Sequence, residues 1–106
     1  MKLLLDEGVP DIIKQRLSSF SIFSVKEMAW RGITNGKLLD LMSQHEFQII
    51  ITTDKNLPHQ QNLTKRQISA IILPANEIPT VVELLPEIAG AIDTILPGDF
   101  KLVEKQ

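Results

Sequence analysis

The chain has 106 residues, a hydrophobic fraction of 43%, a charged fraction of 23%, a net charge of −2 and no cysteine. This length and balance predict one globular domain, residues 1–106, with a single core. The missing cysteines exclude disulfides and thiolate metal sites, and the slightly acidic charge argues against binding nucleic acid by bulk charge alone. Since no apolar run is long enough to span a bilayer and no signal peptide is visible, we expect a cytoplasmic protein with no membrane partner.

Short apolar runs alternate with helical patterns along the chain, which predicts an α/β fold. The expected strands cover residues 2–5, 22–25, 47–51, 70–73 and 100–103. The expected helices run from Pro10 to the serines at 18 and 19, from residue 35 to about residue 45, and from Pro79 to Ile95 with a bend or restart at Pro86. Residues 26–33 and the amide-rich residues 57–63 are expected to be irregular connections, the second with too few aliphatic anchors to be a core element. This order predicts a right-handed, doubly wound and mainly parallel sheet between two helical layers, a three-layer α/β/α sandwich with residues 100–103 at its edge.

On the second helix, Leu38, Leu41, Met42 and His45 recur at helical spacing and are expected to pack on the sheet. The two histidines of the chain are therefore expected to differ. His45 lies on an apolar helix face, whereas His59 lies in the amide-rich connection and is a candidate for a substrate contact.

Two of the predicted strands end abruptly at carboxylates. Ile49, Ile50 and Ile51 show no alternation, so this strand is expected to be central and covered on both faces, with Asp54 at its carboxyl edge. Residues 2–5 end in the same way, at Asp6 and Glu7. If the two strands are parallel neighbours, Asp6 and Asp54 lie at one edge, where Mg²⁺ or Mn²⁺ would relieve their mutual repulsion.

Four pieces of the sequence together resemble a known family, the small bacterial PIN-like proteins, which are predicted nucleases often considered toxin components. The pieces are Leu5-Asp6-Glu7 with Pro10, Trp30-x-Gly32 leading to Asn35-Gly36-x-Leu38-Leu39, Thr52-Thr53-Asp54-x-Asn56-Leu57, and Gln60-Gln61-Asn62-Leu63. They cover nearly the whole chain in order. The resemblance implies a PIN-like α/β/α domain whose acidic cluster binds Mg²⁺ or Mn²⁺ and cleaves RNA, with Asp6 as the first acid, Asp54 as the acid of the Thr-x-Asp motif and Thr52 beside it.

The acidic set departs from the family pattern, because PIN nucleases usually place four acids around the metal. Here Asn35 stands where a carboxylate is expected at a helix start, and Asn56 stands where another often follows Asp54. Fewer charges predict weaker metal binding and weaker water activation. The interpretation is an Mg²⁺- or Mn²⁺-dependent endoribonuclease with a reduced acidic site, in which Asp6 and Asp54 bind the metal and Glu7 positions the attacking water.

Neutral side chains complete the expected site. Asn35, Asn56 and Gln60 would hold metal-bound waters or the scissile phosphate, and Trp30 is a candidate for stacking a base, although a lone tryptophan is more often a core or interface anchor. Asp6, Asp54 and Asn35 are also open to a simpler reading as turn and cap residues.

Two further functions stay open. One is a non-catalytic PIN-like module that binds RNA or protein. The other is a receiver-like phosphoacceptor domain, imitated by the acids after the first strand and by Asp54-Lys55-Asn56-Leu57-Pro58. A receiver would also carry a hydroxyl after its fourth strand and a lysine after its fifth, whereas residues 70–73 run into Pro74 and the nearest later lysine is Lys101.

The resemblance also implies partners, since PIN toxins are commonly held inactive by an antitoxin that inserts a segment into the acidic groove. We expect RNA as the substrate, an antitoxin-like protein as a partner, and a homo-oligomer. Phe23, Trp30 and Ile33 lie in or beside the connection 26–33 and are candidate interface anchors, with burial in the core as the alternative.

Overall fold

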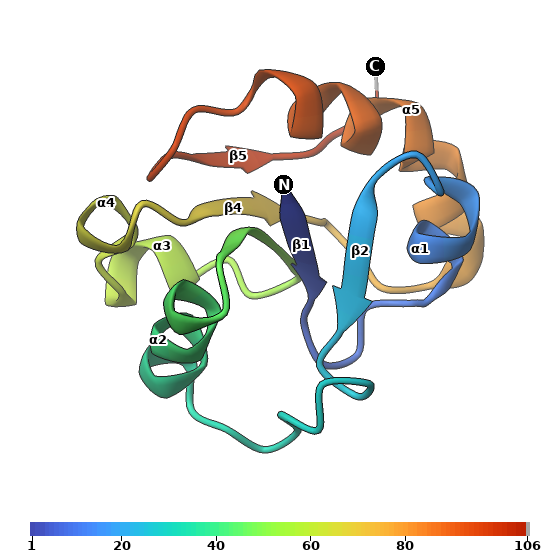
Figure 1. The fold of residues 1–106 in the computed structure, drawn as a ribbon. Helices are drawn as coiled ribbons and strands as arrows, with labels where there is room; N and C mark the ends of the chain where they lie inside the picture. The colour runs from blue at the N-terminus through green and yellow to red at the C-terminus, as the bar shows by residue number, and fades with distance from the viewer. Residues whose placement is uncertain (106) are drawn as a thin grey trace.

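The structure, a computed structural model, describes residues 1–105, which form five strands and five helices (Figure 1). The strands are β1 (Lys2–Leu5), β2 (Ser21–Ser24), β3 (Phe47–Thr52), β4 (Ser69–Ile72) and β5 (Phe100–Leu102). The helices are α1 (Ile12–Arg16), α2 (Asn35–Gln44), α3 (Leu57–Gln60), α4 (Leu63–Arg66) and α5 (Ile78–Thr94). The predicted α/β class is confirmed. Within residues 1–105, no helix combines the length and the apolar character needed to cross a membrane.

The five strands form one sheet in the order β2-β1-β3-β4-β5, and every neighbouring pair is parallel. β1 lies between β2 and β3, so that Leu5 pairs with Ser24 on one side and with Ile51 on the other. The predictions of a parallel sheet, of a central strand at β3 and of an edge strand near residues 100–103 are confirmed. Because all strands point the same way, their carboxyl ends meet at one edge.

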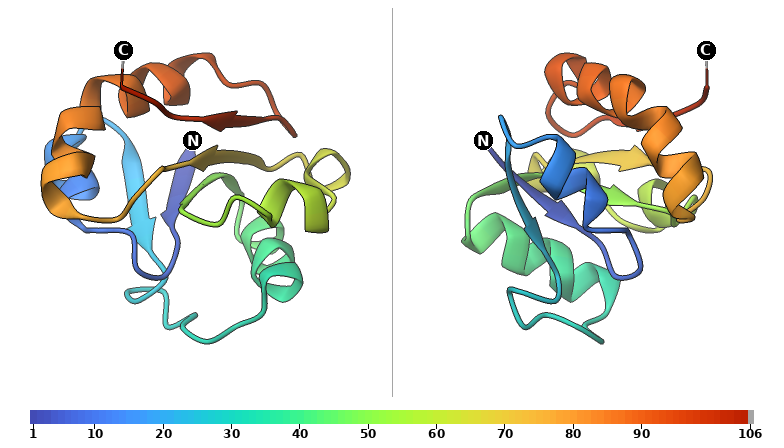
Figure 2. Two further views of the ribbon diagram at one scale, coloured as in Figure 1. Left: turned by 180° about the vertical axis from the view of Figure 1, so that it is seen from behind. Right: turned by 90° about the vertical axis from the view of Figure 1, so that its right-hand side faces the viewer.

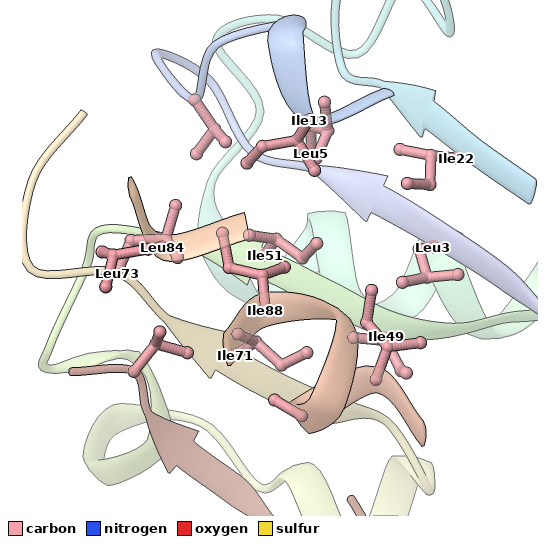
Figure 3. Packing of buried hydrophobic residues seen from close by; sticks show 14 of the residues in the cluster. Leu3, Leu5, Ile13, Ile22, Ile49, Ile51, Ile71, Leu73, Leu84 and Ile88 are labelled. Carbon is pink, nitrogen blue, oxygen red and sulfur yellow. The ribbon is translucent and has the colours of Figure 1, made fainter. Parts of the chain in front are cut away.

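Buried apolar side chains cover both faces of the sheet. Leu5 and Ile51 point to the face that packs under α1 and α5 (Figures 2 and 3). Leu4 and Ile50 point to the opposite face, which packs under α2 and the short helices α3 and α4. Successive side chains of a strand alternate between faces, so the uninterrupted isoleucines 49–51 require cover on both sides.

Helix α1 is shorter than the sequence predicts. It begins at Ile12, two residues after Pro10, and ends at Arg16, since Leu17 leaves the helical backbone with φ −104° and ψ 53°. The serines that follow favour turns over helix because their hydroxyls compete for nearby backbone groups.

The connection after Asp54 is more ordered than predicted. It contains α3 and α4, whose first residues Leu57 and Leu63 are buried with exposed fractions of 0% and 4%. Asn62 caps α4, with the Lys65 N–H donating to Asn62 Oδ1 at 2.8 Å. The prediction that this amide-rich segment lacks core anchors is therefore wrong.

The two longer helices follow their predicted bounds closely. In α2, Leu38 and Met42 are buried, but His45 follows the last turn and is exposed, so the expectation that it packs on the sheet is wrong. Helix α5 continues as one element through Pro86, which is exposed. Its buried side chains on the other face, among them Ile88, hold the helix on the sheet despite the hydrogen bond that proline cannot donate.

The crossover through α5 differs in hand from the other three. The step from β1 to β2 and the step from β4 to β5 run in opposite directions across the sheet, yet α1 and α5 pack on the same face (Figure 2). The steps into β3 and β4 run toward β5 with their helices on the other face, so they share the hand of the first step. Parallel crossovers are normally right-handed, so we assign the right hand to the first three and the left hand to the last. The prediction of a uniformly right-handed winding is therefore wrong at the last crossover.

Candidate functional site

The centre of the sheet contains a switch in winding direction. From β1 the chain moves outward to β2, and from β3 it moves the opposite way to β4, so the connections after β1 and β3 diverge (Figure 1). In open α/β sheets, ligands bind in the crevice that such a divergence leaves beyond the carboxyl ends of the strands. Asp6 directly follows β1, and Thr52 ends β3 two residues before Asp54. The sheet therefore brings the two predicted carboxylates to this place.

A threonine hydroxyl connects the two acidic residues. Thr52 Oγ1 donates to Asp6 Oδ2 at 2.7 Å and accepts the backbone N–H of Asp54 at 3.1 Å. Thr52 is 1% exposed, so its hydroxyl is fixed between these two partners. The Asp6 N–H also donates to Ile51 O at 2.9 Å, which extends the pairing of β1 with β3 by one residue. Asp6, Thr52 and Asp54 are therefore a single hydrogen-bonded unit across the two central strands.

The carboxylate of Asp54 is held by two further groups. Asn35 Nδ2, from the first residue of α2, donates to Asp54 Oδ2 at 3.1 Å, and the Asn56 N–H donates to Asp54 Oδ1 at 2.9 Å. The Asn56 contact closes a local turn of the kind that Asp favours. Asn35 lies at the start of α2, 19 residues earlier in the chain. The structure thus brings the predicted site residue Asn35 beside Asp54.

Glu7 links the end of β1 by a hydrogen bond to the connection between β2 and α2. Its Oε1 accepts the Gly32 N–H at 2.9 Å, while its own N–H donates to Asp6 Oδ1 at 2.8 Å. Glu7 as a residue is exposed. This arrangement fixes Glu7 next to Asp6 but turns its side chain toward Gly32.

Other predicted site residues lie away from the two carboxylates. Trp30 is 9% exposed and packs edge-on against Phe47 and His45 at centroid distances of 5.7 and 5.1 Å, which argues against a base-stacking role. His59 is exposed, and its ring lies 5.6 Å from that of Phe100 at the amino end of β5.

The remaining two predicted residues are amides. Asn56 and Gln60 are exposed, and among residues 1–105 the side chain of neither hydrogen-bonds to Asp6 or Asp54. Of Asn56, only the backbone N–H reaches the site.

The donor set fits a hard divalent cation that keeps several waters. Asp6 and Asp54 supply four carboxylate oxygens, each accepting one hydrogen bond and keeping lone pairs free for a metal or its water. Within residues 1–105, no group of three or more His, Cys, Asp or Glu side chains is arranged to hold a metal ion. Mg²⁺ commonly binds through one or two carboxylates together with waters and substrate phosphates. A site with two carboxylates therefore suits Mg²⁺ better than it suits an ion whose ligands all come from the protein.

Two cationic residues near this site were not assigned to it from the sequence, although Arg31 was considered together with Trp30 for stacking a base. Lys26 and Arg31, both in the connection between β2 and α2, line a cavity of about 250 Å³ together with Asp6 and Glu7. The signal was present in the sequence, because residues that follow β2 reach the same sheet edge as those that follow β1.

Comparison of the chain with protein-family models, with curated proteins and with solved structures finds no match.

Proposed function

We propose that this chain is a metal-dependent endoribonuclease of the PIN-like type, with its helices and sheet forming a three-layer α/β/α sandwich. The observation that carries the proposal is the hydrogen-bonded unit of Asp6, Thr52 and Asp54 at the point where the winding of the sheet reverses. The four pieces of sequence that resemble PIN-like proteins support the choice of RNA as the substrate.

Asp6 and Asp54 would hold the Mg²⁺ or Mn²⁺ ion through their free carboxylate lone pairs. When bound, such an ion activates water and neutralises charge that develops on a phosphate. Thr52 fixes the carboxylate of Asp6 and the backbone of Asp54, and Asn35 restrains the Asp54 carboxylate from the α2 side. Glu7 would orient a water, a role supported by its hydrogen bond to Asp6 and by its exposure.

The neutral Asn35 explains why we expect a slow enzyme. A carboxylate at this position would face Asp54 Oδ2, whereas the amide donates a hydrogen bond to it at 3.1 Å. The amide therefore adds no negative charge to the metal site. Metal affinity and rate should therefore fall below those of a site with four acids.

RNA cleavage tests the proposal. Single-stranded RNA incubated with the protein and Mn²⁺ should yield fragments that EDTA suppresses and that the Asp6→Asn, Asp54→Asn double variant does not produce. The matched control is Asp93→Asn, Glu104→Gln, which removes two exposed carboxylates elsewhere and should cleave as the wild type does. Equal cleavage by the Asp6, Asp54 variant would refute the site. RNA binding without cleavage by the wild type would favour the non-catalytic module.

A second candidate function has one observation in its favour. The strand order 2-1-3-4-5 is that of flavodoxin-like folds, which include receiver domains. Against it, Leu73 and Pro74 follow β4 without a hydroxyl, and Lys105, after β5, pairs with Glu83 at 3.2 Å. Incubation with acetyl phosphate decides the matter, because only a receiver should gain an acid-stable, base-labile label on Asp54.

An antitoxin-like partner and self-association belong to the same proposal. The candidate anchors do not support them: Trp30 is buried, and Phe23 and Ile33 are half-buried against the same apolar cluster. Exposed apolar side chains lie instead on β5, where Phe100 and Leu102 are 41% and 53% exposed. The free lone pairs of Asp6 and Asp54 would suit an Arg or Lys from an inhibitory segment.

Co-expression with the neighbouring reading frame, followed by size exclusion, tests both partner proposals. We expect a complex with the neighbour, and self-association of the chain alone that Leu102→Lys weakens. Monomeric elution of the wild type, unchanged by the neighbour, would refute both.

A further inference from the structure

A second group of charged residues lies beside the two carboxylates, in the connection between β2 and α2. This connection runs beyond the carboxyl ends of β1 and β2 (Figure 1). With the first residues after β1, it encloses the cavity of about 250 Å³ that Lys26 and Arg31 line. Asp6 and Glu7 line the same cavity, so it adjoins the proposed metal site. A ligand bound at Asp6 could extend directly into it.

Both cations are free to bind an anion. Within residues 1–105, the ion pairs join Lys14 to Glu27, Arg66 to Asp40 and Lys105 to Glu83, and none includes Lys26 or Arg31. Both residues are exposed. No carboxylate within 4.0 Å therefore neutralises either charge, although Asp6 and Glu7 line the same cavity.

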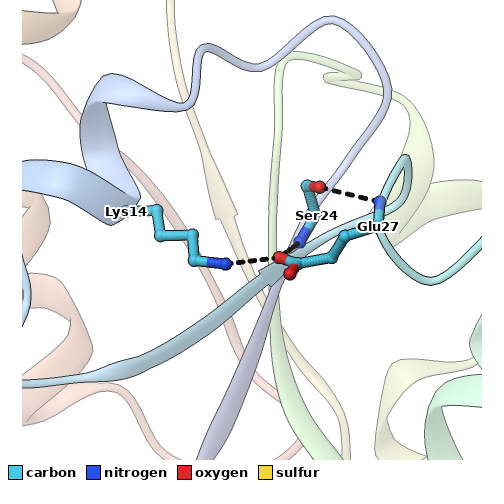
Figure 4. A network of polar contacts seen from close by, with 3 residues as sticks. All are labelled: Lys14, Ser24 and Glu27. Carbon is cyan, nitrogen blue, oxygen red and sulfur yellow. Dashed lines mark hydrogen bonds and ion pairs between the residues drawn. The ribbon is translucent and has the colours of Figure 1, made fainter.

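The backbone around Lys26 is fixed by a compact network (Figure 4). Glu27 Oε1 accepts the Ser24 N–H at 2.8 Å and Lys14 Nζ at 2.7 Å, while Ser24 Oγ accepts the Glu27 N–H at 3.1 Å. The Lys14 hydrogen bond and the Ser24 N–H lower the pKa of Glu27, which keeps this carboxylate ionised. Lys26 lies inside this turn, directly after the buried Val25. The backbone position of Lys26 is therefore fixed before any ligand binds.

Arg31 is anchored on both sides. Trp30 before it is buried, and its N–H donates to Val25 O at 2.9 Å. Gly32 after it donates to Glu7 Oε1 at 2.9 Å and has a φ of +76°, a left-handed conformation that glycine adopts without strain. The backbone at both cations is therefore fixed, and it loses less entropy when a ligand binds than a mobile loop would.

The charge of the cavity makes anion binding depend on a metal. Three carboxylates line it, those of Asp6, Glu7 and Asp11, against the two cations, which gives a net charge of −1. This lining repels a phosphate on its own. A divalent cation at Asp6 changes the balance to about +1, which attracts one.

We propose that Lys26 and Arg31 form a subsite for the phosphate next to the scissile one in a single-stranded RNA. The subsite rests on the proposed nuclease function, because the metal at Asp6 would hold the scissile phosphate beside the cavity and would also make the net charge there positive. Arg31 can bind a phosphate through two parallel N–H groups, and Lys26 adds a point charge. The RNA strand then runs from Asp54 across Asp6 toward the end of β2.

Binding of a fluorescein-labelled oligouridylate, followed by anisotropy, tests the subsite without relying on cleavage. Ca²⁺ replaces Mg²⁺ so that the probe stays intact. The site variant is Lys26→Gln, Arg31→Gln, and the matched control is Arg16→Gln, Lys101→Gln, which removes the same charge from exposed residues outside the cavity. Thermal unfolding confirms that both variants are folded.

We expect the site variant to raise the Kd about tenfold and the control less than about threefold. The slope of log Kd against log salt should fall by about 0.7 for each RNA phosphate that the protein no longer neutralises, in the site variant only. EDTA should weaken wild-type binding by at least as much as the site variant does. An equal effect of the two variants, or wild-type binding that EDTA leaves unchanged, would overturn the subsite.

Two further results separate the subsite from the nuclease function and from a simple anion site. A selective loss of binding in the site variant, with no cleavage by the wild type, would support an RNA-phosphate site at Lys26 and Arg31 and retire the nuclease. Inorganic phosphate should compete with the oligouridylate in the wild type. If the site variant instead loses phosphate competition but keeps its affinity for the oligouridylate, the cavity binds a free anion and the RNA subsite is refuted.

Discussion

The Thr52 hydroxyl can be removed with little change in shape by the substitution Thr52→Val. The hydroxyl donates to the Asp6 carboxylate at 2.7 Å and accepts the Asp54 N–H at 3.1 Å, and valine can do neither. A hydrogen bond to a charged group contributes about 1.5–3 kcal/mol and one between neutral groups about 0.5–1.5 kcal/mol. Since Asp6 and Asp54 are half-buried, water can replace part of the loss, and we expect the free energy of unfolding to fall by about 2 kcal/mol.

Urea unfolding followed by the fluorescence of Trp30, the single tryptophan, measures this change. With a slope of about 2 kcal/mol per molar urea, the midpoint should fall by about 1 M. Thr52→Ser is the control, because it keeps the hydroxyl and loses one methyl group, at a cost of about 1 kcal/mol or less. Mn²⁺ affinity should also fall in Thr52→Val and stay near the wild-type value in Thr52→Ser.

Unfolding of Thr52→Val at the same urea concentration as the wild type would contradict the stabilising role of the Thr52 hydroxyl. An equal loss of stability in Thr52→Ser and Thr52→Val would contradict it too, because the methyl group would then account for the effect. A stability loss in Thr52→Val with unchanged Mn²⁺ affinity would separate the hydroxyl from the metal site.

Three further substitutions test the fold. The hydrogen bond from Lys14 lowers the pKa of Glu27 below its ordinary 4.5, so Glu27 should stabilise the protein above that pH and lose this effect as the pH falls through its lowered pKa. Because both side chains are partly exposed, Glu27→Gln should cost only about 0.5 kcal/mol near pH 7, and a difference from wild type that persists in acid would contradict the assignment. Pro86→Ala should raise the thermal midpoint by several degrees, because alanine donates the missing α5 hydrogen bond, and no increase would mean that the helix already compensates. Gly98→Ala should lower the free energy of unfolding, measured in urea, by about 2 kcal/mol or more, since φ is +83° and the new Cβ would lie 2.9 Å from the α4 backbone. Gly90→Ala, inside α5 and with open space around it, should instead raise it by about 0.5–1 kcal/mol.

The acidic pair could be predicted because its signals are local. Both strands are recognisable in the sequence as runs of aliphatic residues that lead to a carboxylate. Once β1 and β3 are parallel neighbours, Asp6 and Asp54 are expected at the same edge of the sheet. Periodicity alone fixes the two acids to within a few residues. Asn35 was singled out in another way, from the resemblance to PIN-like proteins, which place a carboxylate at this helix start.

The surroundings of the pair could not be predicted in the same way. The path of the connection from β2 to α2 depends on left-handed backbone at Ala29 and Gly32 and on the burial of Trp30, none of which leaves a periodic pattern. The cavity lined by Lys26 and Arg31 exists only because of that path. The sequence around Trp30 does not decide between burial and a role at the surface, and its burial is evident only once its neighbours in space, such as Phe47, are known.

The unusual last crossover follows from the length of α1. With five residues, α1 spans about 7.5 Å and cannot cover the face formed by β1, β3 and β4. The 17-residue α5 covers the rest of that face, which requires it to lie on the α1 side although the chain is moving toward β5. β5 is then added outside β4, far from the switch in winding between β1 and β3. Because, within residues 1–105, the hydrogen bonds of the Asp6, Thr52 and Asp54 side chains involve neither α5 nor β5, a substitution that loosens β5, such as Gly98→Ala, should lower stability and leave Mn²⁺ affinity unchanged.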